Sequence, residues 1–410
     1  MTTHQALDLA DAITSQLADP DVPRSWAVPA YGQHLAYGPP GIALLHIERA
    51  ARGLGPWQRA HDWLTAASCQ PLTSGPDSHP FYGAPTLAHA LTCAADCLPG
   101  AYQSALDSLD RQIVIDVRRR LEAAHRRIDA GGLPQLAEFD VIRGLTGYGA
   151  HLLHRSPDGT TTRAVLDYCV RLTEPLTDQD ETLPGWWTET GPSGNPDDRF
   201  PGGHANHGMA HGIGGVLALL ALAARRGIVV SGHNAAMRTI LAWLDRWETG
   251  DGPAWPYWIT RDELRTGRPT PSTPRRPSWC YGTAGLARAQ QLAALTLGDA
   301  HRRIEAENAL VAALTDSDQL KVITDDGLCH GFAGLAHLAA RVADDAHATT
   351  VDRIRAAIPA LLDKIHPAGG ALGSGDPGLL DGAAGVALAL IAPSTTTPPR
   401  SSWDSCLLIA

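Results

Sequence analysis

Two short strings, almost fifty residues apart, contain side chains that can bind a soft metal ion. Cys280 lies in Trp-Cys-Tyr-Gly at 279–282, and Cys329 and His330 lie in Leu-Cys-His-Gly at 328–331. Each residue alone is more often a packing residue, but equivalent positions in two strings favour a shared metal. Two thiolates and one imidazole are the ligand set of a zinc site with one open position. A structural zinc normally takes four protein ligands and no fourth is in register, so the strings predict a catalytic zinc site.

A third string supplies a candidate proton carrier. His211 directly precedes Gly212, at the same motif position as Tyr281 and His330. Near a metal, a histidine is a natural proton donor or acceptor, whereas elsewhere this position suits helix capping or contact with solvent. Because His211, Tyr281 and His330 all directly precede a motif glycine, His211 is predicted to lie near the metal site.

Other polar residues near these strings are weaker candidates. Asp140 can orient a histidine and stabilise its protonated form, with an N-cap or ion-pair role as the alternative. Arg276, four residues before Cys280, can pair with a carboxylate or a developing oxyanion, unless it is a surface arginine. His204 and His207 are compatible with simple exposure to solvent.

The elements that must position these residues form a repeat. Seven glycine motifs, Gly-x-x-Gly except for a degenerate second copy, begin at Gly38, Gly83, Gly144, Gly212, Gly282, Gly331 and Gly382. The segments after them are apolar nearly all round and predict buried helices. Segments between them, such as 105–128 and 234–248, predict half-exposed amphipathic helices. The pattern predicts an all-α fold, an α/α toroid of about seven inner and seven outer helices, although an open solenoid has the same local signature.

Two stretches interrupt the helical pattern. Residues 183–206 and 250–278 are rich in Gly, Pro and Trp and are predicted to be irregular walls of a cleft. No independent linker is evident, so we expect a single domain over residues 1–410.

The composition excludes several classes of protein. Of the 410 residues, 44% are hydrophobic and 19% charged, which is ordinary for a globular protein with a large core. A net charge of −10 argues against a nucleic-acid partner, because phosphate binding needs a basic face. The longest apolar run, 215–224, is too short to cross a membrane. Seven cysteines without disulfide-scaffold spacing, and an N-terminus unlike a signal peptide, predict a cytoplasmic protein. The scarcity of lysine among many arginines is typical of a bacterial genome rich in GC.

With these motifs, the chain resembles the lanthionine synthetase C family, the zinc-dependent cyclases of lanthipeptide (lantibiotic) biosynthesis. The resemblance covers nearly the whole chain, and its specific elements are Ala-His-Gly at 210–212, Trp-Cys-Tyr-Gly at 279–282 and Cys-His-Gly at 329–331. It implies an α/α toroid of seven inner and seven outer helices, in agreement with the seven motifs. By motif position, the implied Zn²⁺ ligands are Cys280, Cys329 and His330, the acid/base pair is His211 and Asp140, and Arg276 and Tyr281 lie close to the metal.

The resemblance also implies a reaction and its partners. A free-standing cyclase adds precursor-peptide cysteines to dehydroalanine or dehydrobutyrine and so forms lanthionine or methyllanthionine thioether rings. Its substrate is a dehydrated precursor peptide, consisting of leader and core. A separate dehydratase is the expected partner, and a transporter is a further candidate member of the synthetase complex.

Two alternatives remain open at this point. A lanthionine synthetase C-like enzyme of a different role adds glutathione to dehydroamino acids, and turnover of the two kinds of substrate separates it from a cyclase. A non-catalytic, zinc-stabilised scaffold that holds a peptide is the other alternative, and it predicts that His211→Ala leaves every activity intact.

Overall fold

The structure, a computed structural model, describes most of the chain in two compact units. The described residues are 1–21, 32–249, 254–270, 275–365, 376–395 and 397–410. Unit 1 comprises Met1–Ile113 and Lys321–Ser405, and unit 2 comprises Val114–Leu320 and Cys406–Ala410. The expectation that residues 1–410 form a single domain stays a prediction.

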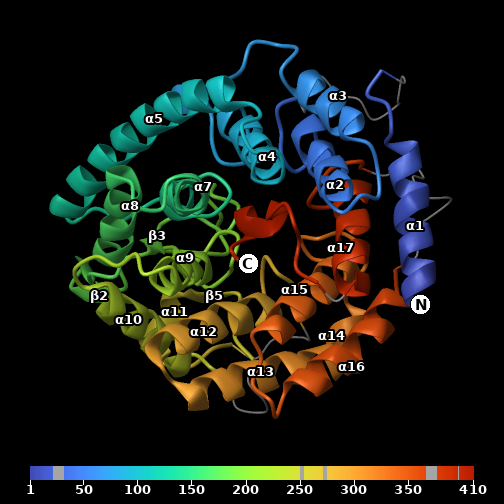
Figure 1. Cartoon of the computed structure of the whole chain (residues 1–410). Helices are drawn as coiled ribbons and strands as arrows, with labels where there is room; N and C mark the ends of the chain where they lie inside the picture. The colour runs from blue at the N-terminus through green and yellow to red at the C-terminus, as the bar shows by residue number, and fades with distance from the viewer. Residues whose placement is uncertain (22–31, 250–253, 271–274, 366–375, 396) are drawn as a thin grey trace. The chain divides into compact units, whose positions relative to one another are not determined.

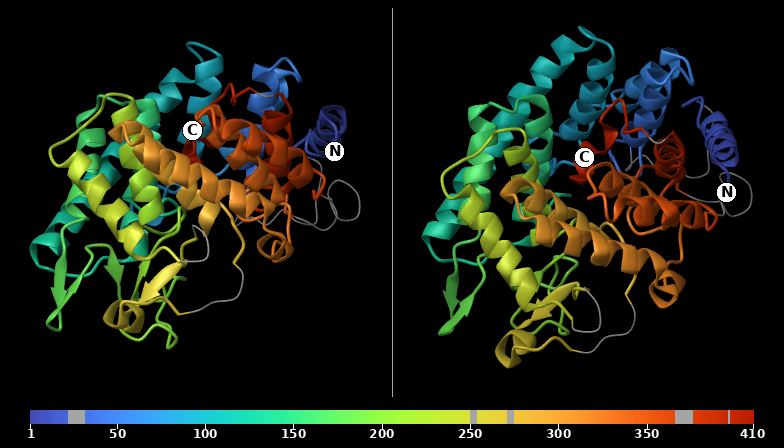
Figure 2. Two further views of the ribbon diagram at one scale, coloured as in Figure 1. Left: turned by 90° about the horizontal axis from the view of Figure 1, so that it is seen from below. Right: turned by 60° about the horizontal axis from the view of Figure 1, so that its bottom comes forward.

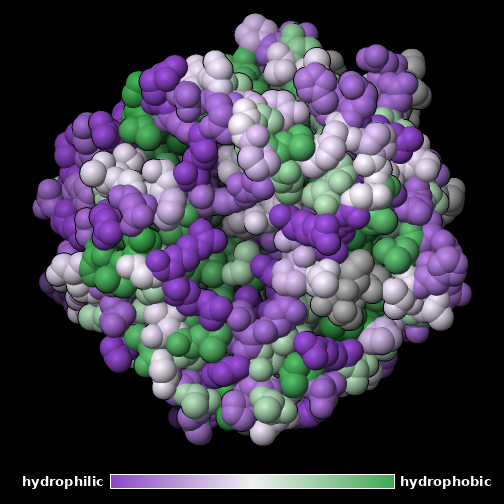
Figure 3. All heavy atoms as spheres, viewed as in Figure 1, coloured by the Kyte–Doolittle hydropathy of each residue, from purple (hydrophilic) through white to green (hydrophobic). Residues whose placement is uncertain are grey.

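Unit 1 consists of helices. They are α1 (Thr3–Gln16), α2 (Pro39–Ala51), α3 (Trp57–Ala67), the 3₁₀ turn η2 (Gly75–Asp77), α4 (Ala84–Cys97), α15 (Phe332–Asp344), α16 (Val351–Leu362) and α17 (Ala383–Thr395). Helices α5 (Gln103–Asp129) and α14 (Ser317–Lys321) and the 3₁₀ segment η3 (Trp403–Leu407) contain the boundaries between the units. Hydrophilic side chains dominate the surface over α5, as its amphipathic sequence predicts (Figure 3).

Unit 2 combines helices with a few short strands. The helices are α6 (Leu136–Phe139), α7 (Leu145–Arg155), α8 (Thr160–Arg171), α9 (Ile213–Arg225), α10 (His233–Arg246), α11 (Arg261–Thr266), α12 (Thr283–Leu297) and α13 (Ala300–Thr315). The strands are β1 (Leu176–Asp178), β2 (Glu181–Leu183), β3 (Trp187–Thr188), β4 (His204–Asn206) and β5 (Trp258–Thr260). Within the described residues, no helix combines the length and apolar character needed to cross a bilayer.

All seven predicted motifs begin a helix. These helices are α2, α4, α7, α9, α12, α15 and α17. Helix α9 shows why the segments after the motifs are buried: every residue from Ile213 to Ala223 is buried. The following helix, α10, buries only one face, at positions spaced by three or four residues from His233 to Leu244, as expected for an amphipathic helix.

Each unit places its buried helices side by side. In unit 1, α15 packs against α17, α17 against α2, and α2 against α4 (Figure 1). In unit 2, α9 packs against both α7 and α12. The amphipathic helices pack against them, α3 on α2 and α13 on α12, for example, while the first helix, α1, packs on the last, α17. The last repeat therefore adjoins the first, an arrangement that an open solenoid does not have.

The second glycine of each motif allows a tight turn. A Cβ atom on Gly285 would overlap the carbonyl oxygen of Trp279, and a Cβ on Gly334 would overlap that of Leu328. In both cases the chain six residues upstream folds back onto the first turn of the helix. Because Trp279 and Leu328 directly precede the two motif cysteines, these glycines fix the backbone that carries the cysteines.

The two stretches predicted to be irregular contain strands, so that part of the prediction is wrong. Strands β3, β4 and β5 form a small antiparallel sheet in which Ala205 pairs with Trp187 and Ile259 (Figure 2). Strand β2, which ends at Leu183, pairs with β1. Of the second stretch, residues 250–253 and 271–274 lie outside the described residues. The sheet is short, so the all-α class is retained.

Candidate functional site

The histidine of the fourth motif is held by a buried carboxylate of the third. Asp140 is 0% exposed, and its Oδ2 lies 2.7 Å from Nδ1 of His211. Its Oδ1 accepts the backbone N–H groups of Arg143 at 2.6 Å and Gly144 at 2.9 Å. Asp140 thus both caps the turn and contacts His211, which combines two roles that the sequence left as alternatives. Nε2 of His211, whose side chain is 28% exposed, remains the nitrogen able to meet a substrate.

Tyr281 lies beside this histidine. The two rings are 6.3 Å apart between centroids. The Tyr281 hydroxyl accepts a hydrogen bond from Nδ2 of Asn206 at 3.0 Å, and Oδ1 of Asn206 accepts the N–H of Gly208 at 2.9 Å. Asn206 therefore fixes the phenol relative to the turn that leads to His211. The sequence did not identify Asn206, because an asparagine before a glycine turn is a common capping residue.

Cys280 belongs to a turn that is hydrogen-bonded to the turn of His211. The thiol side chain is buried, and its backbone carbonyl accepts the N–H of Ala210 at 3.4 Å. A Cβ on Gly208 would lie only 2.6 Å from that carbonyl oxygen, so the two turns pack without space for a side chain there. Oγ of Ser278 lies 3.8 Å from the Cys280 sulfur. Unit 2 thus brings together Cys280, Tyr281, His211 and Asp140.

Arg276 joins this group through its backbone. Its carbonyl accepts the Tyr257 hydroxyl at 3.0 Å, and its side chain is half-buried. The neighbouring Arg275 places its guanidinium 5.0 Å from the centre of the Tyr257 ring, and burial lowers the pKa of that guanidinium. A contact of the Arg276 guanidinium with a developing oxyanion stays a prediction.

His204 and His207 are buried, so the expectation that they are exposed is wrong. His207 donates from Nδ1 to the Pro256 carbonyl at 2.8 Å and accepts at Nε2 from Trp243 at 2.7 Å. His204 bonds the carbonyl of Thr190 through Nδ1 at 2.8 Å. Burial lowers the pKa of each histidine to about 4. Both are therefore neutral packing residues at physiological pH.

In unit 1, Cys329 and His330 lie on the turn before α15. The Cys329 N–H donates to the Leu380 carbonyl at 2.9 Å. The His330 ring lies between two carboxylates, with Nε2 3.5 Å from Asp325 and Nδ1 3.4 Å from Asp381. The sequence offered a signal for Asp381, which precedes its motif glycine as His330 does.

The donor atoms suit a metal ion by chemistry. Cys280 of unit 2 and Cys329 and His330 of unit 1 each offer one ligand atom for a metal. Two sulfurs and one imidazole nitrogen match the preference of zinc and leave the fourth tetrahedral position open. These residues therefore fit the metal that the sequence predicts.

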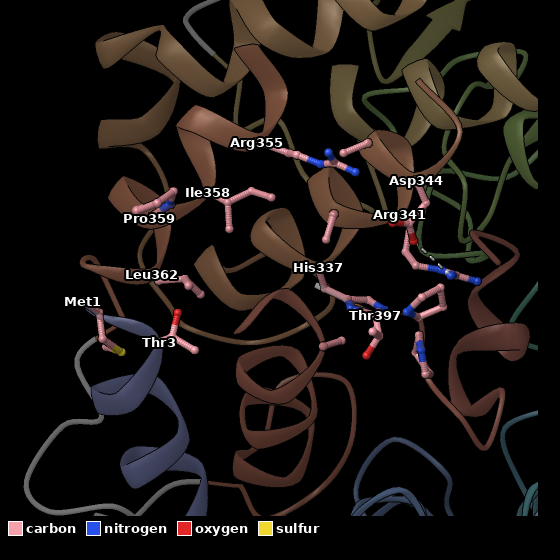
Figure 4. A pocket seen from close by; sticks show the side chains of 15 residues that line it. Met1, Thr3, His337, Arg341, Asp344, Arg355, Ile358, Pro359, Leu362 and Thr397 are labelled. Carbon is pink, nitrogen blue, oxygen red and sulfur yellow. Dashed lines mark hydrogen bonds and ion pairs between the residues drawn. The ribbon is translucent and has the colours of Figure 1, made fainter. Parts of the chain in front are cut away.

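A cavity of about 240 Å³ lies elsewhere in unit 1, among α1, α15, α16 and α17 (Figure 4). Its lining includes His337, Arg341 and Ile358, and His337 is tied through Nε2 to the buried Asp404 at 2.9 Å. None of the seven predicted site residues lines this cavity, so its walls do not belong to the candidate site.

Fold and site together define a helical-repeat protein whose glycine turns carry a metal donor set and a histidine–carboxylate pair. The chain belongs to the lanthionine synthetase C-like family, whose model matches residues 29–408. It is 26% identical over 245 residues to "Nisin biosynthesis protein NisC" of Lactococcus lactis subsp. lactis, an alignment that spans 58% of this chain and 56% of that relative.

A solved structure extends the likeness over the whole fold. The structure of a "Nisin cyclase" matches with a TM-score of 0.76 at 20% sequence identity, covering 99% of this chain and 97% of that chain. The predicted fold class, an all-α α/α toroid, is confirmed.

Proposed function

We propose that this chain is a lanthionine synthetase that cyclises a dehydrated precursor peptide, forming lanthionine or methyllanthionine rings. The observation that carries the proposal is the pairing of His211 with the buried Asp140, 2.7 Å apart, on a turn hydrogen-bonded to that of Cys280. A peptide-binding scaffold has no use for a partly exposed imidazole that a buried carboxylate orients. Family membership and the nisin biosynthesis relative support the same reaction class.

We further propose that Cys280, Cys329 and His330 bind one zinc ion. A bound zinc ion lowers the pKa of a thiol that approaches it, so that thiolate prevails at neutral pH. The remaining steps belong to side chains of unit 2.

His211 supplies the proton. The peptide thiolate forms a sulfur–carbon bond at the β-carbon of the dehydro residue, and the electrons of the carbon–carbon double bond move toward the α-carbon and its carbonyl. The α-carbon then takes a proton from Nε2–H of the His211 imidazolium. Asp140 stabilises that imidazolium and keeps a proton on Nδ1, because its carboxylate contacts only that nitrogen. The proton lost by the thiol balances the proton gained by the carbon.

Arg276 and Tyr281 are proposed to stabilise the negative charge on the carbonyl oxygen during addition. The Tyr281 hydroxyl accepts a hydrogen bond from Nδ2 of Asn206 at 3.0 Å, which fixes the position of the phenol. The substrate is expected to be the leader and core of a precursor peptide dehydrated by a separate enzyme in the cytoplasm.

The test uses a synthetic peptide that carries one cysteine and one dehydroalanine. Cyclisation leaves the mass unchanged, so ring formation is read as loss of reaction with a thiol-alkylating reagent. We expect the zinc-loaded wild type to protect the thiol and His211→Ala to protect it far more slowly. His301→Ala, which removes an exposed histidine of α13 that pairs with Glu305, is the matched control.

Two outcomes would contradict the proposal. Equal rates of ring formation by wild type and folded His211→Ala would show that His211 does not supply the proton. Addition of glutathione to the dehydroalanine peptide, without ring formation when glutathione is absent, would favour the glutathione-adding alternative.

A further inference from the structure

The motif position that carries His211, Tyr281 and His330 carries a tyrosine in the first two repeats. Tyr37 directly precedes Gly38, and Tyr82 directly precedes Gly83. The same position of the glycine turns thus bears the proposed reactive residues in later repeats and aromatic residues in the earliest ones. Each of these residues directly precedes the N-cap glycine of a buried helix, although Gly83 and Gly282 have positive φ and the others negative φ.

Two histidines join these tyrosines in one cluster of unit 1, which we name the aromatic rim: His34, Tyr37, His79 and Tyr82. The His34 ring lies 4.7 Å from Tyr37, 6.1 Å from His79 and 6.0 Å from Tyr82, between centroids. The rings of His79 and Tyr82 are 5.8 Å apart. All four residues are half-buried rather than enclosed, so the cluster presents ring surface outward.

The backbone holds this cluster in place. His34 and Tyr82 form an antiparallel bridge. Nδ1 of His34 accepts the N–H of Ala36 at 3.2 Å, and Nδ1 of His79 accepts the N–H of Phe81 at 3.2 Å. With Nδ1 of His34 as acceptor, the hydrogen of its neutral imidazole resides on Nε2. The aromatic rim is therefore held in place by backbone contacts and offers ring faces together with the Nε2–H group of His34.

His34, whose ring is close to each of the other three rings, is uncharged at neutral pH. Burial, with a smaller contribution from His79, lowers the pKa of His34 to about 4. With His34 uncharged at its centre, the cluster of ring faces favours apolar and aromatic side chains, by area and by stacking.

Backbone hydrogen bonds connect this cluster to the turn of Cys329 and His330 within unit 1. Three bonds join the turns in order: Cys329 N–H to Leu380 O at 2.9 Å, Leu379 N–H to Ala36 O at 2.6 Å, and Leu35 N–H to Phe81 O at 3.0 Å. The helices behind these turns, α15, α17, α2 and α4, pack in the same order (Figure 1). The proposed metal ligands and the aromatic rim thus lie on one continuous series of turns.

From this arrangement, we propose that the aromatic rim binds the substrate peptide at a segment away from its reacting cysteine. The segment carries aromatic or aliphatic side chains, which stack on the rings, and one of its backbone carbonyls accepts a hydrogen bond from Nε2–H of His34. The proposal rests on the proposed cyclase function, because that function places the reacting cysteine at the turn of Cys329 and His330. The rim then selects among peptides by what flanks the ring-forming residues.

The experiment compares two synthetic substrates. One is a minimal peptide with cysteine and dehydroalanine, and the other is the same peptide extended on both sides by phenylalanine-containing segments. In Tyr37→Ala/Tyr82→Ala, we expect the ratio of the KM of the extended peptide to that of the minimal peptide to rise about tenfold, since a stacked ring contributes on the order of 1 kcal/mol. Tyr37→Phe/Tyr82→Phe keeps the rings and is expected to keep most of the preference.

Matched controls separate recognition from a general loss of structure. Tyr102 also contacts a histidine, with its ring centroid 6.3 Å from that of His61, but it does not precede a motif glycine. Tyr102→Ala should therefore leave the KM ratio as in wild type. An unchanged ratio in the folded Tyr37→Ala/Tyr82→Ala variant would overturn the proposal.

A direct binding measurement keeps this proposal separable from the proposed reaction. Calorimetric titration with the extended peptide needs no turnover. If wild type forms no ring with either peptide but binds the extended one about tenfold more tightly than the double alanine variant does, the cyclase function fails and the aromatic rim is supported. Equal affinity of the two proteins for the extended peptide overturns the rim.

Discussion

The histidines of the two units are held in different ways. In unit 2, a fully buried carboxylate lies 2.7 Å from His211 and is itself fixed by two backbone N–H groups. In unit 1, His330 lies between Asp325 and Asp381, both about a third exposed and 3.4 to 3.5 Å away. His211 is thus positioned by the protein alone, as a proton carrier requires, whereas His330 has the looser surroundings expected of a ligand that a metal would complete.

The largest expected effect concerns metal content. Cys329→Ala should leave the protein with sub-stoichiometric zinc after dialysis, because one of three proposed ligands is lost, whereas His211→Ala should retain zinc while losing ring formation. Metal analysis by mass spectrometry together with the thiol-protection assay checks both. Cys93→Ala, at a buried cysteine of α4, is the control for removal of a thiol. Stoichiometric zinc in Cys329→Ala would contradict the assignment of Cys329 as a zinc ligand.

The next effect concerns the carboxylate of unit 2. Asp140→Asn keeps an oxygen for the N–H groups of Arg143 and Gly144 but loses the charge that stabilises a protonated His211. We expect kcat to fall by roughly a hundred- to ten-thousandfold, with zinc content unchanged. Single-turnover ring formation measures the fall. A change below about threefold would show that His211 does not act as the imidazolium and would remove the contrast between the two units.

Because unit 2 contains buried histidines, we expect its free energy of unfolding to decrease at acidic pH. His207 is 0% exposed, and burial lowers its pKa from 6.5 to about 4. Below pH 6.5 His207 is protonated in the unfolded chain, whereas in folded unit 2 it stays neutral down to about pH 4. The free energy of unfolding therefore decreases as the pH falls from about 6.5 to about 4. Once the pH is below both pKa values, the loss for this histidine is roughly 3 kcal/mol.

Urea unfolding across this window measures the loss. His207→Asn should flatten the dependence of unfolding free energy on pH, whatever its effect at neutral pH. An unchanged slope in the variant would show that the histidine is protonated inside unit 2, and that its partners Pro256 and Trp243 do not hold the neutral form.

Features that depend on residues adjacent in sequence could be predicted, whereas features that depend on tertiary contacts could not. The seven helix starts were predictable, because each glycine motif and its apolar segment are contiguous in sequence. The candidate metal donors were found in the same way, because they lie one or two residues before a motif glycine. Strand pairing such as Ala205 with Ile259 joins residues far apart in the chain, and each strand is too short to show alternation. The burial of His204 and His207 was likewise hidden, because it depends on tertiary partners rather than on neighbours in sequence.

The carboxylate of Asp325 contacts His330 in unit 1, as that of Asp140 contacts His211 in unit 2. Oδ1 of Asp325 accepts the N–H of Gly327 at 3.0 Å, while its other oxygen faces Nε2 of His330. The turn therefore orients the Asp325 carboxylate toward the His330 ring. We therefore expect Asp325 to hold the imidazole through Nε2 once the ring binds metal, and Asp325→Asn to weaken zinc binding by about ten- to a hundredfold.

A matched control exists one repeat later. Asp376 occupies the equivalent motif position and caps Gly378 N–H at 2.7 Å in the same way, but on the turn before α17 rather than on the turn of His330. Competition with a chromophoric chelator should show weaker zinc binding in Asp325→Asn than in Asp376→Asn, and the cobalt-substituted spectrum should shift only in the former. If both variants lose the same affinity for zinc, the loss comes from the missing hydrogen bond to the turn and not from a contact with His330. If Asp381→Asn alone weakens binding, Nδ1 rather than Nε2 is the nitrogen that a carboxylate holds, and the order of the two carboxylates is reversed.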